Sequence, residues 1–275
     1  MSALRTVRLA SSRGHVRLDL GGLWAFRELA QILAWRDFKV RYKQTVLGAA
    51  WAVLQPLLTM AAFTLFFGRL AKVPSDGHPY PVFVFSGTLI WQLFSNALTQ
   101  SSSSLVNNQH LLTKVYFPRL IIPLSAVLSG FVDFSIGLVF LFAVMAYYHV
   151  APGVQLVFLP AFVVLAVVAA LAVGIWLAAL NVRYRDVRYA VPFLIQMWML
   201  ASPIAYPAEL VPGRWRALYA LNPMVGIVEG MRWTLFGDRV FPGSVLWMGC
   251  GVIAVFLCGG IWYFRRTERT FADIV

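Results

Sequence analysis

Asp133 is the only acidic side chain that falls inside a predicted membrane span of this sequence. A carboxylate at membrane depth is costly, so it is by default a candidate for function, for example in carrying protons. The hydroxyls of Ser125, Ser129 and Ser135 are close enough in sequence to satisfy it as a structural group, and both interpretations stay open. Because a proton-coupled carrier normally uses several such groups, Asp133 does not predict that this chain drives transport by itself.

Other residues capable of chemistry are scattered. The sequence contains no GxxxxGK[ST] phosphate loop, no HExxH and no GxSxG motif. The four histidines, at positions 15, 78, 110 and 149, are too dispersed to predict a metal site. Cys250 and Cys258 lie about 12 Å apart along one predicted helix, which is too far for a disulfide. We therefore expect no catalytic residue, no metal and no cofactor in this chain, and we do not expect an enzyme.

Composition places these residues in a membrane. Hydrophobic residues make up 60% of the chain and charged residues 12%, with a mean hydropathy of +0.74. Such a chain is too apolar to be covered by a polar surface in water. A spanning helix needs about 20 mostly apolar residues, and six runs approach this length: 47–68, 81–103, 120–148, 154–180, 191–206 and 243–264. The sequence thus predicts an all-α integral membrane protein with six transmembrane helices.

The fifth run and the segment after it are less regular. The fifth run is short and carries Pro192 and Pro203, so we expect a break there. Another apolar stretch, 219–237, would bury Glu229 and Arg232 as a full span and would move the C-terminus to the other side. We predict instead a partial or re-entrant helix on the outer side, in which these two residues, three apart, can pair with each other.

Most of the 23 Lys and Arg residues fall on one side of this six-helix arrangement. Because positively charged loops resist translocation, both termini are predicted to be cytoplasmic. Anionic lipid of the inner leaflet then accounts for the net charge of +12, without nucleic acid. The predicted domains are a basic cytoplasmic tail (1–20), an amphipathic interfacial helix (21–46), the transmembrane domain (47–264, with a re-entrant segment 207–242) and a cytoplasmic C-terminal tail (265–275).

The segment before the first span has the pattern of an amphipathic helix. Apolar residues recur near helical spacing, with charged residues between them, at Leu23, Phe26, Leu29, Ala30, Leu33 and Val40. We expect this helix to lie in the inner membrane interface, with Trp24 and Trp35 at headgroup depth. A helix packed on a partner protein is the alternative. The expected inner-interface residues are Arg36, Lys39, Arg41, Tyr42 and Lys43.

Four stretches of sequence carry motifs in a characteristic order. They are RDFKVRYKQTVLG (36–48) with Trp51 and LQPL (54–57), FPR (117–119) with PLS (123–125) and Asp133-Phe134, NVRYRDV (181–187), and SPIAYP (202–207) with NP (222–223). Together they resemble ABC-2 type exporter permeases for polysaccharide, over about residues 35–264. The resemblance is closest to permeases for O-antigen and related lipid-linked polysaccharides, with teichoic acid permeases second.

This resemblance implies a homodimer in the bacterial inner membrane, with a conduit for a polyprenyl-linked glycan between the two copies. Each copy is expected to dock a separate cytoplasmic ATPase that binds ATP and Mg²⁺. Short cytoplasmic helices carry the ATPase motion in this family, and they map here to 107–116 and 183–189. The expected coupling residues are Asn107, Asn108, His110, Leu111, Lys114, Tyr116, Tyr184, Arg185 and Asp186. The alternative for the first segment is a solvated loop. The alternative for the arginines of the second segment is that they only keep this loop on the cytoplasmic side.

Aromatic residues, 15% of the chain, are the expected lining of the conduit, because the apolar C–H faces of sugars stack on aromatic rings. The candidates are Trp51, Phe63, Phe66, Phe67, Trp91, Phe94, Phe131, Phe134 and Trp198. Phe is also common at lipid-facing positions and Trp in interfacial belts, so only a minority of these is expected to contact glycan. Glu229 and Arg232 are candidates for the outer mouth.

Two other classes of protein stay open. The first is an ABC-2 exporter of small hydrophobic molecules, which shares the fold. The polysaccharide-type motifs at 36–48 and 181–187 favour a polysaccharide exporter over this class. A membrane-embedded transferase for a lipid-linked sugar would need clustered His, Asp or Glu at a membrane face, which the sequence does not show.

Overall fold

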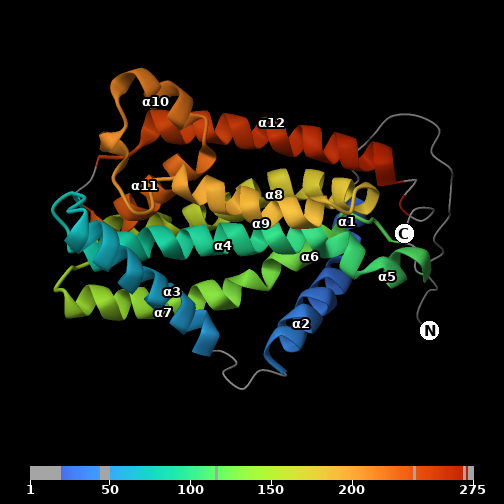
Figure 1. Ribbon diagram of the computed structural model, residues 1–275. Helices are drawn as coiled ribbons and strands as arrows, with labels where there is room; N and C mark the ends of the chain where they lie inside the picture. The colour runs from blue at the N-terminus through green and yellow to red at the C-terminus, as the bar shows by residue number, and fades with distance from the viewer. Residues whose placement is uncertain (1–19, 44–49, 115–116, 238–239, 269–270, 272–275) are drawn as a thin grey trace.

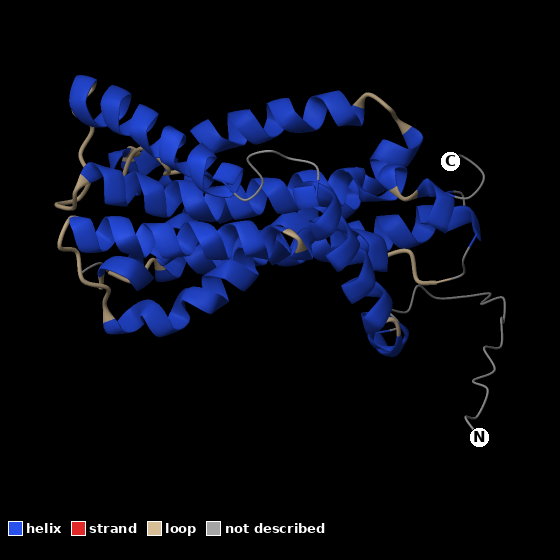
Figure 2. Cartoon of the chain, turned by 90° about the horizontal axis from the view of Figure 1, so that it is seen from below, coloured by secondary structure: helices blue, strands red, loops and turns tan. Residues whose placement is uncertain are grey.

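The computed structural model describes residues 20–43, 50–114, 117–237, 240–268 and 271. Within these ranges all regular structure is helical (Figure 2), which confirms the predicted all-α class for the described part of the chain. The predicted basic tail, apart from Leu20, lies outside the described residues, as do most residues of the predicted C-terminal tail.

In the described part of the chain, five helical stretches are long and apolar enough to cross a membrane. They are α3 (Ala50–Phe63) with the π-helical η1 (Thr64–Leu70), α4 (Tyr80–Asn107), α6 (Ile121–Leu128) with α7 (Gly130–Tyr147), the 3-10 helix η2 (Val154–Phe158) with α8 (Leu159–Arg183), and α12 (Gly243–Thr267). These stretches correspond to the first, second, third, fourth and sixth predicted spans.

The fifth predicted span differs from the prediction. Its helix, α9 (Val187–Leu200), begins earlier than expected and ends at Leu200. Pro203 and Pro207 follow in irregular chain, because proline lacks an amide donor and disfavours helical geometry in the residue before it. A helix of this length is about 21 Å long, which is shorter than the hydrocarbon core of about 30 Å. The expected break therefore lies at the C-terminal end of this helix.

Most of the shorter helices lie toward the two ends of the bundle, and α2 (Arg27–Lys43) runs obliquely from one end toward its middle (Figure 1). The shorter helices are α1 (Leu20–Ala25), α2, α5 (Gln109–Lys114), the 3-10 turn η3 (Ala208–Leu210), α10 (Gly213–Ala220) and α11 (Pro223–Phe236). Helices α1 and α5 lie at the same end as the C-terminal end of α12, and α10 lies at the opposite end. We name these the inner end and the outer end, following the predicted orientation.

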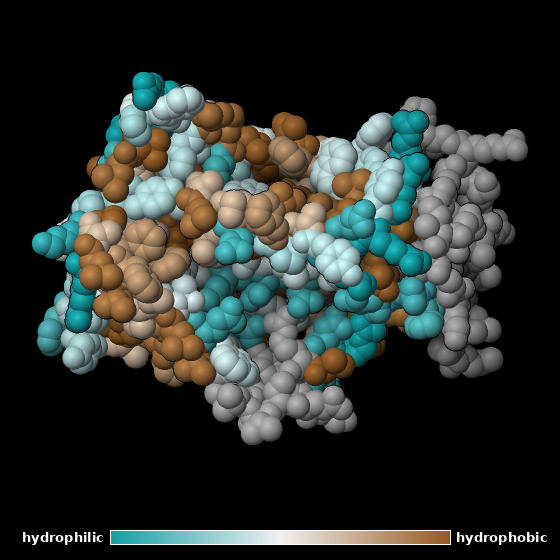
Figure 3. Space-filling model, viewed as in Figure 1, coloured by the Kyte–Doolittle hydropathy of each residue, from teal (hydrophilic) through white to brown (hydrophobic). Residues whose placement is uncertain are grey.

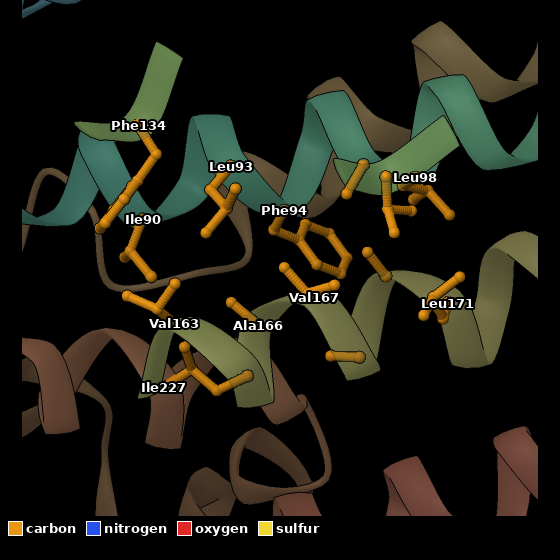
Figure 4. Close-up of a cluster of buried hydrophobic side chains, with 14 of the residues drawn as sticks. Ile90, Leu93, Phe94, Leu98, Phe134, Val163, Ala166, Val167, Leu171 and Ile227 are labelled. Carbon is orange, nitrogen blue, oxygen red and sulfur yellow. The ribbon is translucent and has the colours of Figure 1, made fainter. Parts of the chain in front are cut away.

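Helix α4 runs through the middle of the bundle and packs against α8, α6, α7, α11, α3 and α9. Figure 4 shows Ile90, Phe94 and Leu98 of α4 facing Val163 and Leu171 of α8, all of them buried. The two helices run in the same direction. A Cβ on Gly174 of α8 would lie 2.6 Å from Ser101 Oγ of α4, so the small residue permits close packing. Parallel packing brings the C-terminal ends of α4 and α8 to the same, inner end.

Helix α11 is buried on nearly all sides, since each of its residues except Trp233 is buried. Its glycines allow this. A Cβ on Gly226 would lie 2.8 Å from Leu246 Cα of α12, and one on Gly230 would clash with the ring of Phe162 of α8. Gly237 ends the helix with a φ of +75°, a left-handed conformation that glycine adopts without strain. Helix α11 thus fills the outer end of the bundle between α4, α8 and α12.

Candidate functional site

At the inner end, the predicted interfacial helix contacts the predicted coupling segment. Arg36 Nη2 of α2 donates to Asn108 Oδ1 at 2.6 Å and to Asp37 Oδ1 at 2.7 Å. Asn108 Nδ2 in turn donates to the Ser104 carbonyl of α4 at 2.8 Å. Asn108 ends α4 and precedes α5. The sequence placed Arg36 and Asn108 in separate groups, and the structure joins them.

The apolar face of the N-terminal helix lies against the protein. Leu33 is buried, Phe26, Leu29 and Ala30 pack on the core, and α2 packs on α6. Val40, which the pattern assigned to this face, is 70% exposed. The exposed apolar side chains are instead Trp24, Ile32, Trp35 and Val40, with Lys39 Nζ 5.4 Å from the centre of the Trp35 ring. Arg41, Tyr42 and Lys43 form the last turn of α2, and their side chains lie outside the described part of the structure.

Both predicted coupling segments lie at the inner end. In the first, Asn107 and His110 are exposed and Leu111 is half-buried against the core. Lys114 ends α5; its side chain and the whole of Tyr116 lie outside the described residues. In the second, Arg183, Tyr184, Arg185 and Asp186 are exposed, and the Arg183 guanidinium lies 5.5 Å from the centre of the Tyr184 ring. The two segments therefore offer exposed polar surface at one end of the molecule.

Asp133 is half-buried on α7, one turn after Gly130. The three hydroxyls that the sequence offered it donate elsewhere: Ser125 to the Ile122 carbonyl, Ser129 to Ala126 and Ser135 to Phe131, at 2.8–3.0 Å. Each serine thus uses its hydroxyl hydrogen on a carbonyl of the preceding turn, and the role of Asp133 stays a prediction.

The predicted aromatic lining divides into buried and exposed rings. Phe94 and Trp91 are 0% and 4% exposed, with ring centres 5.2 Å apart, and Trp198 packs edge-on against Phe94 at 5.0 Å. In this structure Phe94 and Trp91 are core residues, which present almost no surface to a polymer. Phe134 is buried as well, whereas Phe63, Phe67 and Phe131 are half-buried and Trp51 and Phe66 are exposed, Trp51 by 50%. The rings that remain available are those of α3, η1 and α7, together with half-buried Trp198 of α9.

Glu229 and Arg232 form the ion pair that their spacing indicates, with Arg232 Nη1 2.9 Å from Glu229 Oε1. The Arg232 side chain is 0% exposed. Its Nη2 donates to the Ile204 carbonyl at 2.8 Å and to the Phe83 carbonyl at 3.4 Å, and the guanidinium lies 3.6 Å from the centre of the Phe83 ring. A buried charge is tolerated only with such partners. Arg232 therefore ties α11 to α4 and to the chain beyond α9.

Asn222 is a second connection at the outer end, and the sequence pattern did not reveal its role. Its Oδ1 accepts from the Met224 amide at 3.0 Å and from Trp198 Nε1 at 2.8 Å. Its Nδ2 donates to the Ala201 carbonyl at 3.0 Å and to Ser202 Oγ at 3.1 Å. It is thus the N-cap of α11 and also holds the end of α9. The Asn-Pro pair at a helix start was the available signal.

The sequence also gave a signal that was missed on α4. Six neutral polar residues on one side of this otherwise buried helix are exposed or half-buried: Gln92, Ser95, Asn96, Thr99, Gln100 and Ser103. We call them the α4 polar stripe. Figure 3 shows hydrophilic surface in the middle of this face of the bundle. Polar groups do not face lipid without cost, so the stripe indicates a surface that protein, water or a polar ligand covers.

Within the described residues, no group of three or more His, Cys, Asp or Glu side chains could hold a metal. What the structure assembles is a helical bundle of membrane-crossing length with polar connections at both ends and a polar stripe along its central helix. This defines an integral membrane protein with several spans.

The chain belongs to the ABC-2 type transporter family, whose profile matches residues 28–236. It is 29% identical to the O-antigen export system permease protein RfbA of Myxococcus xanthus, over 92% of this chain and 97% of that protein. A Klebsiella pneumoniae protein of the same name is 28% identical over 94% of this chain and 98% of its own length. The polysialic acid transport protein KpsM of Escherichia coli is 22% identical over 76% of this chain and 80% of its own.

Proposed function

We propose that this chain is the permease subunit of an ABC exporter that moves a polyprenyl-linked, O-antigen-like polysaccharide across the bacterial inner membrane. The observation that carries this proposal is the similarity to O-antigen export permeases over nearly the full length of both chains, together with membership of the ABC-2 family. ATP and Mg²⁺ are bound by a separate cytoplasmic ATPase.

In this proposal α9 makes a sixth crossing and both termini are cytoplasmic. Helix α1 and the C-terminal end of α12 lie at the same end of the bundle (Figure 1), so the chain crosses between them an even number of times. The five long helices supply an odd number. Helix α9 is therefore the sixth crossing. The irregular chain after Leu200 spans the rest of the membrane thickness, where it is packed against protein and not against lipid.

The outer segment 207–242 is then re-entrant. Helix α11 starts beside Ala201, at the end of α9, and ends beside Gly153, whose amide donates to the Leu235 carbonyl at 3.3 Å. Gly153 lies in the turn between α7 and η2, at the outer end. The chain therefore enters and leaves from one side. Glu229 and Arg232 hold this segment in place, and an outer mouth for the conduit lies beside it.

Coupling to the ATPase occurs through α5 and the exposed loop 183–187. The contact from Arg36 to Asn108 joins α5 to the interfacial helix, so movement of α5 reaches both α4 and α2. Because α4 continues directly from this contact to the outer end, one rigid helix connects the docking surface to Arg232.

The working unit is a homodimer, with the conduit between the two copies. Exposed apolar side chains cover α3 and η1, including Trp51, Leu58 and Phe66, and the α4 polar stripe lies on the central helix against which α3 packs. A second copy covers this polar surface from lipid, and the conduit between the copies lies along it.

Co-expression with an ABC ATPase from the same genome tests the proposal. The permease is purified through a tag on itself alone and reconstituted in lipid nanodiscs. The proposal predicts that the ATPase co-purifies in a one-to-one ratio and hydrolyses ATP. A folded, dimeric permease that binds no ATPase would contradict the proposal and favour a membrane enzyme.

A further inference from the structure

The α4 polar stripe consists of two rows that repeat every four residues. Gln92, Asn96 and Gln100 form a row of amides, and Ser95, Thr99 and Ser103 form a row of hydroxyls. Residues four apart on a helix lie on one face, about 6 Å apart along the axis. The rows thus run along the helix as a regular ladder of neutral groups, across about 17 Å of the membrane's depth.

The two rows offer different hydrogen bonds. Each hydroxyl donates to a carbonyl of its own helix: Ser95 to Gln92 at 3.2 Å, Thr99 to Ser95 at 2.8 Å and Ser103 to Thr99 at 3.0 Å. Their oxygens keep a lone pair as acceptors. Each amide carries donors as well as an acceptor, and Asn96, in the middle of the row, is exposed. The ladder therefore matches a ligand with many similar hydroxyl groups that both donate and accept.

The charges near the stripe are unfavourable for an anion. Residues 81–106 contain no charged side chain. The guanidinium of Arg232 is fully buried and paired with Glu229. A polyanion passing the stripe thus finds no cation on α4 to replace the water that it loses.

We propose that the α4 polar stripe is the contact surface for the translocated glycan, and that it selects an uncharged glycan over an acidic one. This inference rests on the proposed function and names its substrate class. A neutral polysaccharide exchanges its hydrogen bonds with water for bonds to the amides and hydroxyls of the stripe. Because successive groups are alike, the glycan does not bind tightly at any one position. A chain of sialic acid or phosphate-linked units has no counter-charge here.

Transport in proteoliposomes tests the inference. The permease–ATPase complex is reconstituted with the ATPase outside, and two probes on the same polyprenyl diphosphate carrier are compared: a neutral hexose homopolymer and a sialic acid homopolymer of similar length. Uptake is measured as glycan protected from an added glycosidase. We expect the neutral probe to enter at least about tenfold faster, since one tenth of the rate corresponds to only about 1.4 kcal/mol, less than the cost of burying a charge.

A lysine in the stripe sharpens the test. Asn96→Lys is expected to lower neutral uptake and to reduce the preference for the neutral probe by about fivefold or more. Ser135→Lys, on an exposed position of α7, is the matched control and is expected to leave the preference unchanged. Equal or faster uptake of the sialic acid polymer by the unaltered complex overturns the inference and leaves the proposed function standing. Uptake of neither probe by an ATP-hydrolysing complex contradicts the proposed function as well.

Discussion

The two ends of this bundle both use an arginine to join helices, but in opposite surroundings. At the outer end Arg232 is completely buried and bonded to a carboxylate and to carbonyls of two other segments. At the inner end the Arg36 side chain is 43% exposed when it contacts Asn108 and Asp37. A buried ion pair is costly to break, whereas an exposed one contributes little to stability. The outer connection therefore fixes the fold, and the inner connection can change during a transport cycle.

The largest effect is expected at Arg232. Arg232→Met leaves Glu229 buried without its cation and removes the bonds to Ile204 and Phe83, so we expect a loss of about 3–5 kcal/mol of stability. The measurement is thermal unfolding of the purified permease in nanodiscs. Replacing both partners, as Arg232→Met with Glu229→Leu, is expected to recover most of the loss. Equal stability of the single variant and the natural chain would show that the pair does not hold α11.

A smaller effect is expected at Asn222. Asn222→Ala removes the N-cap of α11 and leaves Trp198 Nε1 without its acceptor, at a cost of about 2–3 kcal/mol. Asn222→Ser keeps a capping oxygen and is expected to be intermediate. Unfolding in the same nanodiscs measures both variants, and an alanine variant that matches the serine variant would refute the capping role.

Substitution of Arg36 is expected to have the smallest effect on stability. Its main effect is expected on the coupling between the permease and the ATPase. Arg36→Ala removes an exposed contact and is expected to change stability by no more than about 1 kcal/mol. Stimulation of the partner ATPase by the permease should fall about twofold to fivefold, the equivalent of about 0.5–1 kcal/mol. Arg27→Ala, which removes another exposed charge of α2, one whose guanidinium lies beside Trp24, is the control. Loss of stimulation in both variants would assign the effect to charge alone.

Much of the fold could be predicted from the sequence, because a helix that crosses a membrane needs a long, continuous run of apolar residues. Among the residues that the structure describes, five helices of spanning length lie where runs of apolar residues indicated them. The end of α9 was less predictable, because Ala201 and Ile204 are held by Asn222 and Arg232, which lie 21 and 28 residues further along the chain. Local pattern gives no information about such contacts.

The candidate site was predicted less well, for two physical reasons. Aromatic composition does not distinguish a ring that lines a conduit from one that fills a core, and Phe94 and Trp91 proved to be buried. The α4 polar stripe was visible as polar residues at intervals of four inside an apolar run, yet its meaning depends on which face of α4 the other helices leave uncovered. Contacts such as that of Arg36 with Asn108, 72 residues apart, require the fold.

Export in cells tests the central claim most directly. The chain and its ATPase are expressed in a bacterium that makes a neutral, polyprenyl-linked O-polysaccharide but lacks its own export permease, and surface glycan is detected with an antibody. The account predicts surface glycan that requires both proteins. Accumulation of the lipid-linked glycan inside the cell, although the permease–ATPase complex is present and hydrolyses ATP, would contradict it.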